Sequence, residues 1–306
     1  MSVFSEQLKY LRKKNKLTQK ECSQFLSDSR EELLNVDYVS ISRWEKESVR
    51  PSLKKQIMII RLLGGDVEAL LAENFQDSKH QQVIERWAAK KYDTINLMLA
   101  FQKGPTSTHE CTLEQAKDES DAAFVVERMK RANEILELSE SNHNSLYGDY
   151  LLNEYRAISF CRDEQGLIGY SIDLKFDKDL LPAILKRVDP DHIPATAIDK
   201  TKKLILYSYA RMFVHSSAFK KLTQNYIQKI IDTPSIQKAV VRVMDQDLYK
   251  LLSQLGFEVL TTYNNSPVKL IEIGNKKYST VLLGINIEEL LSSMNVLGYI
   301  FCPNSK

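Results

Sequence analysis

The chain has 306 residues, of which 43% are apolar and 27% are charged, as in ordinary globular proteins long enough for two domains. The formal net charge is +2, so the whole molecule is no general binder of polyanions, and any nucleic-acid-binding surface must be local. No stretch approaches the ~18 uninterrupted apolar residues that a membrane-spanning helix needs. We therefore predict a cytoplasmic protein without a membrane partner.

The cysteines favour free thiols over a metal site or a disulfide framework. They are scattered along the chain, with no Cys-x-x-Cys pair and no histidine at ligand spacing nearby. The four residues are Cys22, Cys111, Cys161 and Cys302. Free thiols fit a reducing cytosol, and we expect no metal site.

The first ~75 residues have helical periodicity throughout, which predicts an all-α N-terminal domain. Thr18 and Glu21 form the pattern of a capping box, so a helix is expected to begin there. Asn35 is expected to supply left-handed backbone in the next turn, and Asp37 to cap the short helix that follows. The intervening segment Ser27–Leu34 either lengthens the first of these helices or forms a loop.

Three short blocks between residues 17 and 52 are the most informative part of the chain. They read Leu17-Thr18-Gln19-Lys20-Glu21, Ile41-Ser42-Arg43-Trp44-Glu45-Lys46 and Arg50-Pro51-Ser52. Together they resemble the helix-turn-helix of the lambda-repressor (XRE) family, whose second helix enters the major groove of DNA. The resemblance implies a sequence-specific DNA-binding transcriptional regulator with double-stranded DNA as its partner.

The resemblance also assigns roles to individual side chains. Gln19 is expected to brace a contact with the DNA backbone, and Lys20 to contact a phosphate. Tyr38 and Ser40 begin the second helix, where base contacts concentrate. Mixed base and phosphate contacts are expected from Ser42, Arg43 and Lys46. Residues 1–63 contain 13 basic and 8 acidic side chains, a local net charge of +5 that suits DNA.

The rest of the chain has a different pattern. A predicted helix over 79–100 and the linker Gly104–Thr108 lead to a region where helical patterns, the first over 112–138, alternate with strand-like runs. This mixture predicts an α/β (α+β) domain. We expect a helix-turn-helix domain at 1–75, a connecting helix and linker at 76–110, and the α/β domain at 111–306.

Part of the second domain resembles the GNAT (N-acetyltransferase) superfamily. The pattern is a strand-like run at Leu204–Tyr209, a helix, a second run at Ala239–Val243, and Gln254-Leu255-Gly256-Phe257 before another strand. A hairpin around Gly166 falls where that fold places its second and third strands. The resemblance covers roughly residues 150–285 and implies that acetyl-CoA would bind a glycine-rich loop at the start of a helix.

In this chain the GNAT loop would correspond to Ala218–Asn225, with Lys220 in place of the usual arginine. The glycine positions fall on side chains whose Cβ atoms obstruct close approach of the phosphates. They are Lys221, Thr223 and Asn225. An acyl-CoA or acyl ligand, if one binds, is expected near Val214, His215, Lys220, Lys221, Thr223 and Asn225.

The position of the usual general acid also departs from the GNAT pattern. Leu252 occupies the place of the tyrosine that often protonates the departing thiolate, although Tyr249 lies one turn earlier. We therefore predict no catalytic residues and no enzyme activity. The domain would instead bind a small-molecule or protein effector, or form a homodimer, which a DNA half-site also favours. The alternative is an active acyl-CoA-dependent N-acyltransferase fused to a DNA-binding domain.

Overall fold

The structure is a computed structural model that forms two compact units. It describes residues 1–75, 82–93, 111–117, 120–127 except 122 and 126, 156–163, 166–186, 203–264 and 269–301. The first unit comprises residues 1–81, 231–234 and 288–306, and the second comprises residues 82–230 and 235–287. The predicted linker Gly104–Thr108 and the two ends of the predicted 79–100 helix lie outside the described residues.

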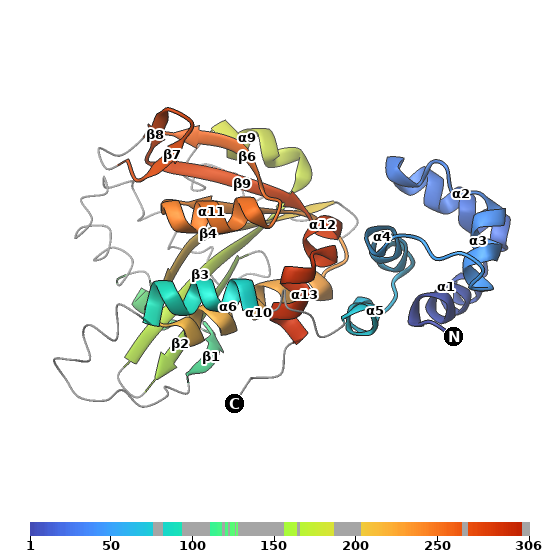
Figure 1. Cartoon of the computed structure of the whole chain (residues 1–306), viewed down its shortest axis with the longest axis horizontal. Coiled ribbons are helices and arrows are strands. Elements are labelled where there is room, and N and C mark those ends of the chain that lie inside the picture. Colours follow the sequence, from blue (N-terminus) through green and yellow to red (C-terminus); the bar gives the residue numbers. More distant parts are fainter. Residues whose placement is uncertain are drawn as a thin grey trace. The chain divides into compact units, whose positions relative to one another are not determined.

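The N-terminal part of the first unit is built from helices (Figure 1). They are α1 (Val3–Lys14), α2 (Gln19–Ser29), the 3-10 turn η1 (Glu31–Leu33), α3 (Tyr38–Glu45), α4 (Leu53–Leu63) and α5 (Val67–Asn74). Their apolar faces meet in one core, in which Leu8, Leu26, Ile41, Ile57 and Leu70 are fully buried. Residues 288–301, in α12 (Ile287–Ser292) and α13 (Met294–Phe301), belong to the same unit.

The capping signals in this unit act as predicted. The Thr18 hydroxyl accepts a hydrogen bond from the Glu21 backbone N–H at 3.2 Å, and the Glu21 carboxylate accepts one from the Thr18 N–H at 2.7 Å. Asp37 caps α3 by accepting from the Ser40 N–H at 2.7 Å. Such caps satisfy backbone donors that the helix itself leaves without partners, which fixes where α2 and α3 begin.

The turn between α2 and α3 differs from the prediction at Asn35. Among the described non-glycine residues, the left-handed backbone lies at Lys16 (φ 56°) and Glu47 (φ 59°), so the left-handed conformation expected of Asn35 was wrong. The segment Ser27–Leu34 both lengthens α2 and forms the turn η1. Leu33 anchors η1 because its side chain is fully buried.

The second unit is organised around a seven-stranded sheet in the order β1-β2-β3-β4-β5-β9-β6. The strands are β1 (Thr112–Gln115), β2 (Arg156–Asp163), β3 (Gly166–Asp177), β4 (Leu204–Phe213), β5 (Ile236–Val243), β6 (Glu258–Tyr263) and β9 (Thr280–Asn286). Neighbouring strands are antiparallel except for β4 and β5, which are parallel. A parallel pair needs a crossover, and α10 (Ser216–Asp232) provides it.

Shorter elements complete the second unit. They are α6 (Gln82–Ala88), the π-helix η3 (Ala89–Asp93), η4 (Lys178–Leu180), α9 (Leu181–Lys186), α11 (Gln246–Gln254) and the hairpin β7 (Ile271–Ile273) with β8 (Lys276–Tyr278). The start of the helix predicted over 112–138 was wrong, because Thr112–Gln115 pairs with β2 as an edge strand. All four residues of this strand are exposed, so no buried alternation marked it in the sequence.

Candidate functional site

Helix α3 carries the predicted DNA-contacting face on a firmly packed helix. Ile41 is 0% exposed and Trp44 is 7% exposed, and the Trp44 ring contacts the Phe4 ring edge-on at 6.3 Å between centroids. Tyr38, at the first position of the helix, is 57% exposed. Of the predicted contact residues, Lys20, Tyr38, Arg43 and Lys46 are exposed, whereas Gln19, Ser40 and Ser42 are half-buried.

A buried ion pair sets α3 against α1 and α2. Arg12 on α1 binds the two carboxylate oxygens of Glu45 at 2.6 and 3.1 Å, and it also donates to the Leu17 carbonyl at 2.8 Å. The amide of Gln19, at the start of α2, donates to the same carboxylate at 2.7 Å. Helices α1, α2 and α3 therefore meet at the Glu45 side chain, for which the sequence pattern predicted no role. Gln19 orients α2 from within the domain.

The charge of Glu45 is maintained by its partners. Burial opposes ionisation of this carboxyl, but hydrogen bonds from Arg12 and Gln19 outweigh it, so the Glu45 pKa lies below its ordinary value. At neutral pH the pair is therefore fully ionised. A bidentate arginine–carboxylate contact also fixes orientation, which holds the exposed face of α3 in one position.

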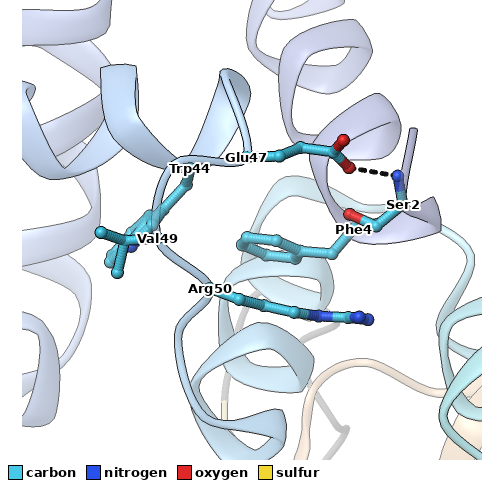
Figure 2. Close-up of a pocket in the computed structure, with 6 residues that line it drawn as sticks. All are labelled: Ser2, Phe4, Trp44, Glu47, Val49 and Arg50. Carbon is cyan, nitrogen blue, oxygen red and sulfur yellow. Dashed lines mark hydrogen bonds between the residues drawn. The ribbon is translucent and has the colours of Figure 1, made fainter.

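A small pocket lies beside this helix, next to the N-terminus of α1 (Figure 2). Its volume is about 190 Å³, below the ~300 Å³ at which small-molecule sites begin. Glu47 closes one side of it by accepting hydrogen bonds from the Ser2 backbone N–H and, at 2.9 Å, from the Ser5 hydroxyl. Those hydrogen bonds lower the pKa of Glu47 to about 2. We therefore interpret the pocket as the place where Glu47 caps the start of α1, and not as a ligand site.

In the second unit, the parallel strands β4 and β5 separate part of the way along. Their pairing ends at Ser208 and Val241, although β4 continues to Phe213 alongside β3, and β5 continues to Val243 alongside β9. The register between β3 and β4 shifts at Tyr209, which has no partner in β3. The carboxyl halves of β4 and β5 therefore belong to different strand pairs. Diverging carboxyl ends of this kind are where open α/β sheets bind ligands.

Helix α10 begins two residues after β4, at the same edge. Val214 donates its N–H to the Ile168 carbonyl at 2.9 Å, and with His215 it forms the whole connection. Since α10 has 17 residues, its N-terminus carries the positive end of the helix dipole. The exposed Val214 and the polar Ser216 and Ser217 lie at this terminus.

The acyl-CoA loop predicted over 218–225 is helical instead. Asn225 donates to the Ser159 hydroxyl at 2.9 Å, and Lys221 donates to the Cys111 carbonyl. The Thr223 hydroxyl is buried. Asn225 therefore joins α10 to β2, and Lys221 joins it to the residue before β1. Lys220 instead binds Glu85 of α6 at 2.7 Å.

The segment formed by α6 and η3 lies where β4 ends and α10 begins. The Tyr92 ring lies 5.8 Å from that of Phe213 and 5.7 Å from that of Phe219, and the Trp87 ring lies 5.4 Å from that of Phe219. Lys91 pairs with Asp245 and Asp247, which follow β5. This segment thus contacts the carboxyl end of β4 and the residues that follow β5.

A buried charge cluster between α10 and the sheet was missed by sequence reasoning. Asp173 of β3 is 1% exposed and pairs with Lys229 of α10 at 3.0 Å and Arg211 of β4 at 3.4 Å. Burial opposes its ionisation, but Lys229 and Arg211 prevail and lower the Asp173 pKa. The sequence signal that could have revealed this cluster is a set of small polar residues within otherwise apolar strands. They are Ser159, Ser171 and Ser208.

The described residues contain no group of three or more histidine, cysteine, aspartate or glutamate side chains that could hold a metal ion. No helix within the described ranges is long and apolar enough to span a bilayer. Cys22, Cys111 and Cys161 are free and buried, and Cys302 lies outside the described residues. Leu252 and Tyr249, the two candidates for the general-acid position, both lie in α11.

No family model matches the chain, and no curated protein matches it either. The solved structures that are similar at low identity include the following three. FeeM, an N-acyl amino acid synthase from uncultured soil microbes, is 12% identical, with 61% of this chain and 96% of that one covered and a TM-score of 0.43. Spermidine N-acetyltransferase from Vibrio cholerae is 13% identical, covering 59% and 98%, with a TM-score of 0.36. Aminoglycoside N(6')-acetyltransferase from Legionella pneumophila is 11% identical, covering 60% and 96%, with a TM-score of 0.35.

The mixed seven-stranded sheet with its helices agrees with the α/β (α+β) domain expected from the sequence. The prediction that this domain is not an enzyme was wrong: the three similar structures named above, which contradict it, are an N-acyl amino acid synthase and two N-acetyltransferases. One of its two physical premises, the obstructed phosphate loop, also fails. The obstructing side chains at Lys221, Thr223 and Asn225 lie inside α10 rather than in a phosphate-binding loop.

Proposed function

We propose that this chain is an acyl-CoA-dependent N-acyltransferase fused to a DNA-binding domain. The observation that carries the enzyme half is the separation of β4 from β5 beside the N-terminus of α10. A thioester placed between the diverging strands would have its phosphates near the positive end of a 17-residue helix. The amine of an acceptor would attack the thioester carbonyl there, releasing coenzyme A.

The DNA-binding half is supported by the exposed face of α3. This face combines Tyr38, Arg43 and Lys46 with two half-buried serines on a helix whose opposite residues are packed into the core. Arginine and lysine supply phosphate affinity, and polar side chains near a helix N-terminus suit base edges. We further propose that two copies act together, because one such helix spans only a half-site.

Acyl-CoA binding is expected to stabilise the protein measurably. At ~100 times its Kd, a ligand that binds the folded chain alone adds about 2.7 kcal/mol, or roughly 5–10 °C in Tm. Differential scanning fluorimetry with acetyl-CoA and longer acyl-CoA thioesters measures this shift, and thiol release in the presence of an amine mixture measures transfer. Free acetate serves as the control. Absence of both stabilisation and thiol release would refute the enzyme proposal.

Loss of the cations on α3 is expected to weaken DNA binding. The double variant Arg43→Ala/Lys46→Ala should lose about 10- to 100-fold in affinity and reduce the slope of log Kobs against log[salt] by ~1–2. Fluorescence anisotropy on DNA fragments selected by the wild-type protein measures both. The matched control is Lys276→Ala/Lys277→Ala, which removes two exposed lysines of β8. Equal losses in the two variants would show that net charge, rather than α3, governs binding.

A further inference from the structure

Arg242 occupies a special position in the sheet. It follows Val241, the last β5 residue that pairs with β4, and it faces Leu282 of β9 in register. It is therefore the first β5 residue at the point where β4 and β5 separate. Its guanidinium carbon lies 5.0 Å from the centroid of the Tyr209 ring, which belongs to the β4 residue at the register shift.

The Arg242 side chain has no anionic partner among the residues that the structure describes. Its Nε is buried and makes no hydrogen bond, and the described groups with which the guanidinium interacts are two tyrosines, Tyr209 and Tyr263, neither of which supplies a carboxylate. Other arginines with buried side chains have carboxylate partners: Arg12 has Glu45 and Arg211 has Asp173. Since a half-buried cation gains stability from a paired anion, Arg242 is prepared for a ligand that supplies one.

The face of the sheet identifies which substrate supplies this anion. Ser208 belongs to the polar cluster under α10, and Val241 pairs with it, so the next residue, Arg242, projects to the opposite face. On that face lie Tyr209 and Tyr263, which pack with the apolar core cluster. The phosphates of an acyl-CoA donor belong at the N-terminus of α10. The anion at Arg242 therefore belongs to the acyl acceptor.

We propose that Arg242 binds the carboxylate of the acceptor, so that the acceptor is an amine carrying a carboxylate a few bonds away, as in an α-amino acid. This inference rests on the proposed acyltransferase function. The acceptor amine forms a C–N bond to the thioester carbonyl carbon, the C–S bond breaks, and the thiolate takes up the proton that the amine loses. A guanidinium binds a carboxylate in a planar two-point contact, which would fix the amine relative to the carbonyl.

Matched acceptor pairs test the proposal. Each of a panel of α-amino acids is compared with the amine that lacks its carboxylate, such as phenylalanine with phenethylamine, using an acyl-CoA donor. Wild type is expected to favour the carboxylate-bearing member. Arg242→Gln should raise KM for that member about 100-fold and leave KM for the amine unchanged, with Arg242→Lys in between. A wild type that acylates the bare amines equally well across the panel overturns the proposal.

A matched arginine controls for general damage to the sheet. Arg162 of β2 also lies over an aromatic ring, that of Phe160 at 4.7 Å, and its Nε is also buried, but it pairs with Asp121 at 3.7 Å. Arg162→Gln is expected to keep the preference for carboxylate acceptors. If Arg162→Gln also lost that preference, the assignment of the acceptor carboxylate to Arg242 would be contradicted. The same holds if Arg242→Gln changed only the KM for the acyl-CoA donor.

A binding measurement separates this inference from the proposed function. Calorimetry compares N-acetylphenylalanine with N-acetylphenethylamine, which differ in the carboxylate. Tight binding of the first to wild type but not to Arg242→Gln, without any acyl transfer, supports the carboxylate site and rejects the acyltransferase. Acyl transfer, together with equal binding of both compounds to both proteins, supports the acyltransferase and rejects the carboxylate site.

Discussion

Replacing Asp173 with asparagine is expected to destabilise the second unit by about 3–5 kcal/mol, because two buried cations then face each other without a carboxylate. Lys229 is 11% exposed and Arg211 14% exposed, so water cannot solvate them as it would at the surface. The cluster joins β3, β4 and α10, so its loss weakens the edge of the sheet at which α10 begins. Chemical denaturation followed by circular dichroism measures the loss.

Two further variants make the prediction about Asp173 specific. Asp179→Asn removes an exposed carboxylate of the same unit and should change stability by less than ~0.5 kcal/mol. Adding Lys229→Gln to Asp173→Asn removes one of the orphaned cations and should recover part of the loss. Equal stability of Asp173→Asn and Asp179→Asn would contradict the role assigned to the cluster. Because the folded pKa of Asp173 is lowered, its stabilisation is present above the unfolded pKa and disappears as pH falls through the folded value.

Replacing Glu45 with alanine is expected to destabilise the N-terminal helices by about 3 kcal/mol or more and to weaken DNA binding with them. The guanidinium of Arg12 and the amide of Gln19 lose their common acceptor, so α1, α2 and α3 lose the contact that orients them. Thermal unfolding measures the first effect. Anisotropy at a temperature where the variant is folded measures the second.

A carboxylate of the same unit provides the control for Glu45. Glu32 is exposed in the turn η1, and Glu32→Ala should leave Tm within about 2 °C of wild type. The lowered pKa of Glu45 adds a pH signature, since its contribution is present above the unfolded pKa of ~4.3 and is lost as pH falls through the folded value. If Glu45→Ala and wild type had the same stability at neutral pH, the ion pair would have no structural role.

The N-terminal helices could be predicted from the sequence because their signals are local. Thr18 with Glu21 and Asp37 with Ser40 are contacts between residues three apart, so the printed order of amino acids already contains them. The Arg12–Glu45 pair spans 33 positions, and no local pattern marks it. The DNA-contacting roles of α3 came from a family resemblance and stay predictions.

In the second unit, buried strands were easier to predict than the elements around them. Strands β2 to β5 are rich in β-branched and aromatic residues, whereas β1 is an exposed edge strand whose pairing with β2 alone defines it. The phosphate loop predicted over 218–225 was placed too far along the chain, because α10 already begins at Ser216. Arg242 was overlooked because its significance depends on where two strands separate.

The grouping of residues 288–306 with residues 1–81 means that the chain returns to its first unit after completing the sheet. Glu288 contacts Arg30 at 3.3 Å and Arg61 at 3.9 Å, and Arg61 also donates to the Pro234 carbonyl at 2.9 Å. Burial lowers the pKa of Arg61 to about 10. A fragment that ends between residues 76 and 110 would therefore lack Glu288 and Pro234, two partners of Arg61.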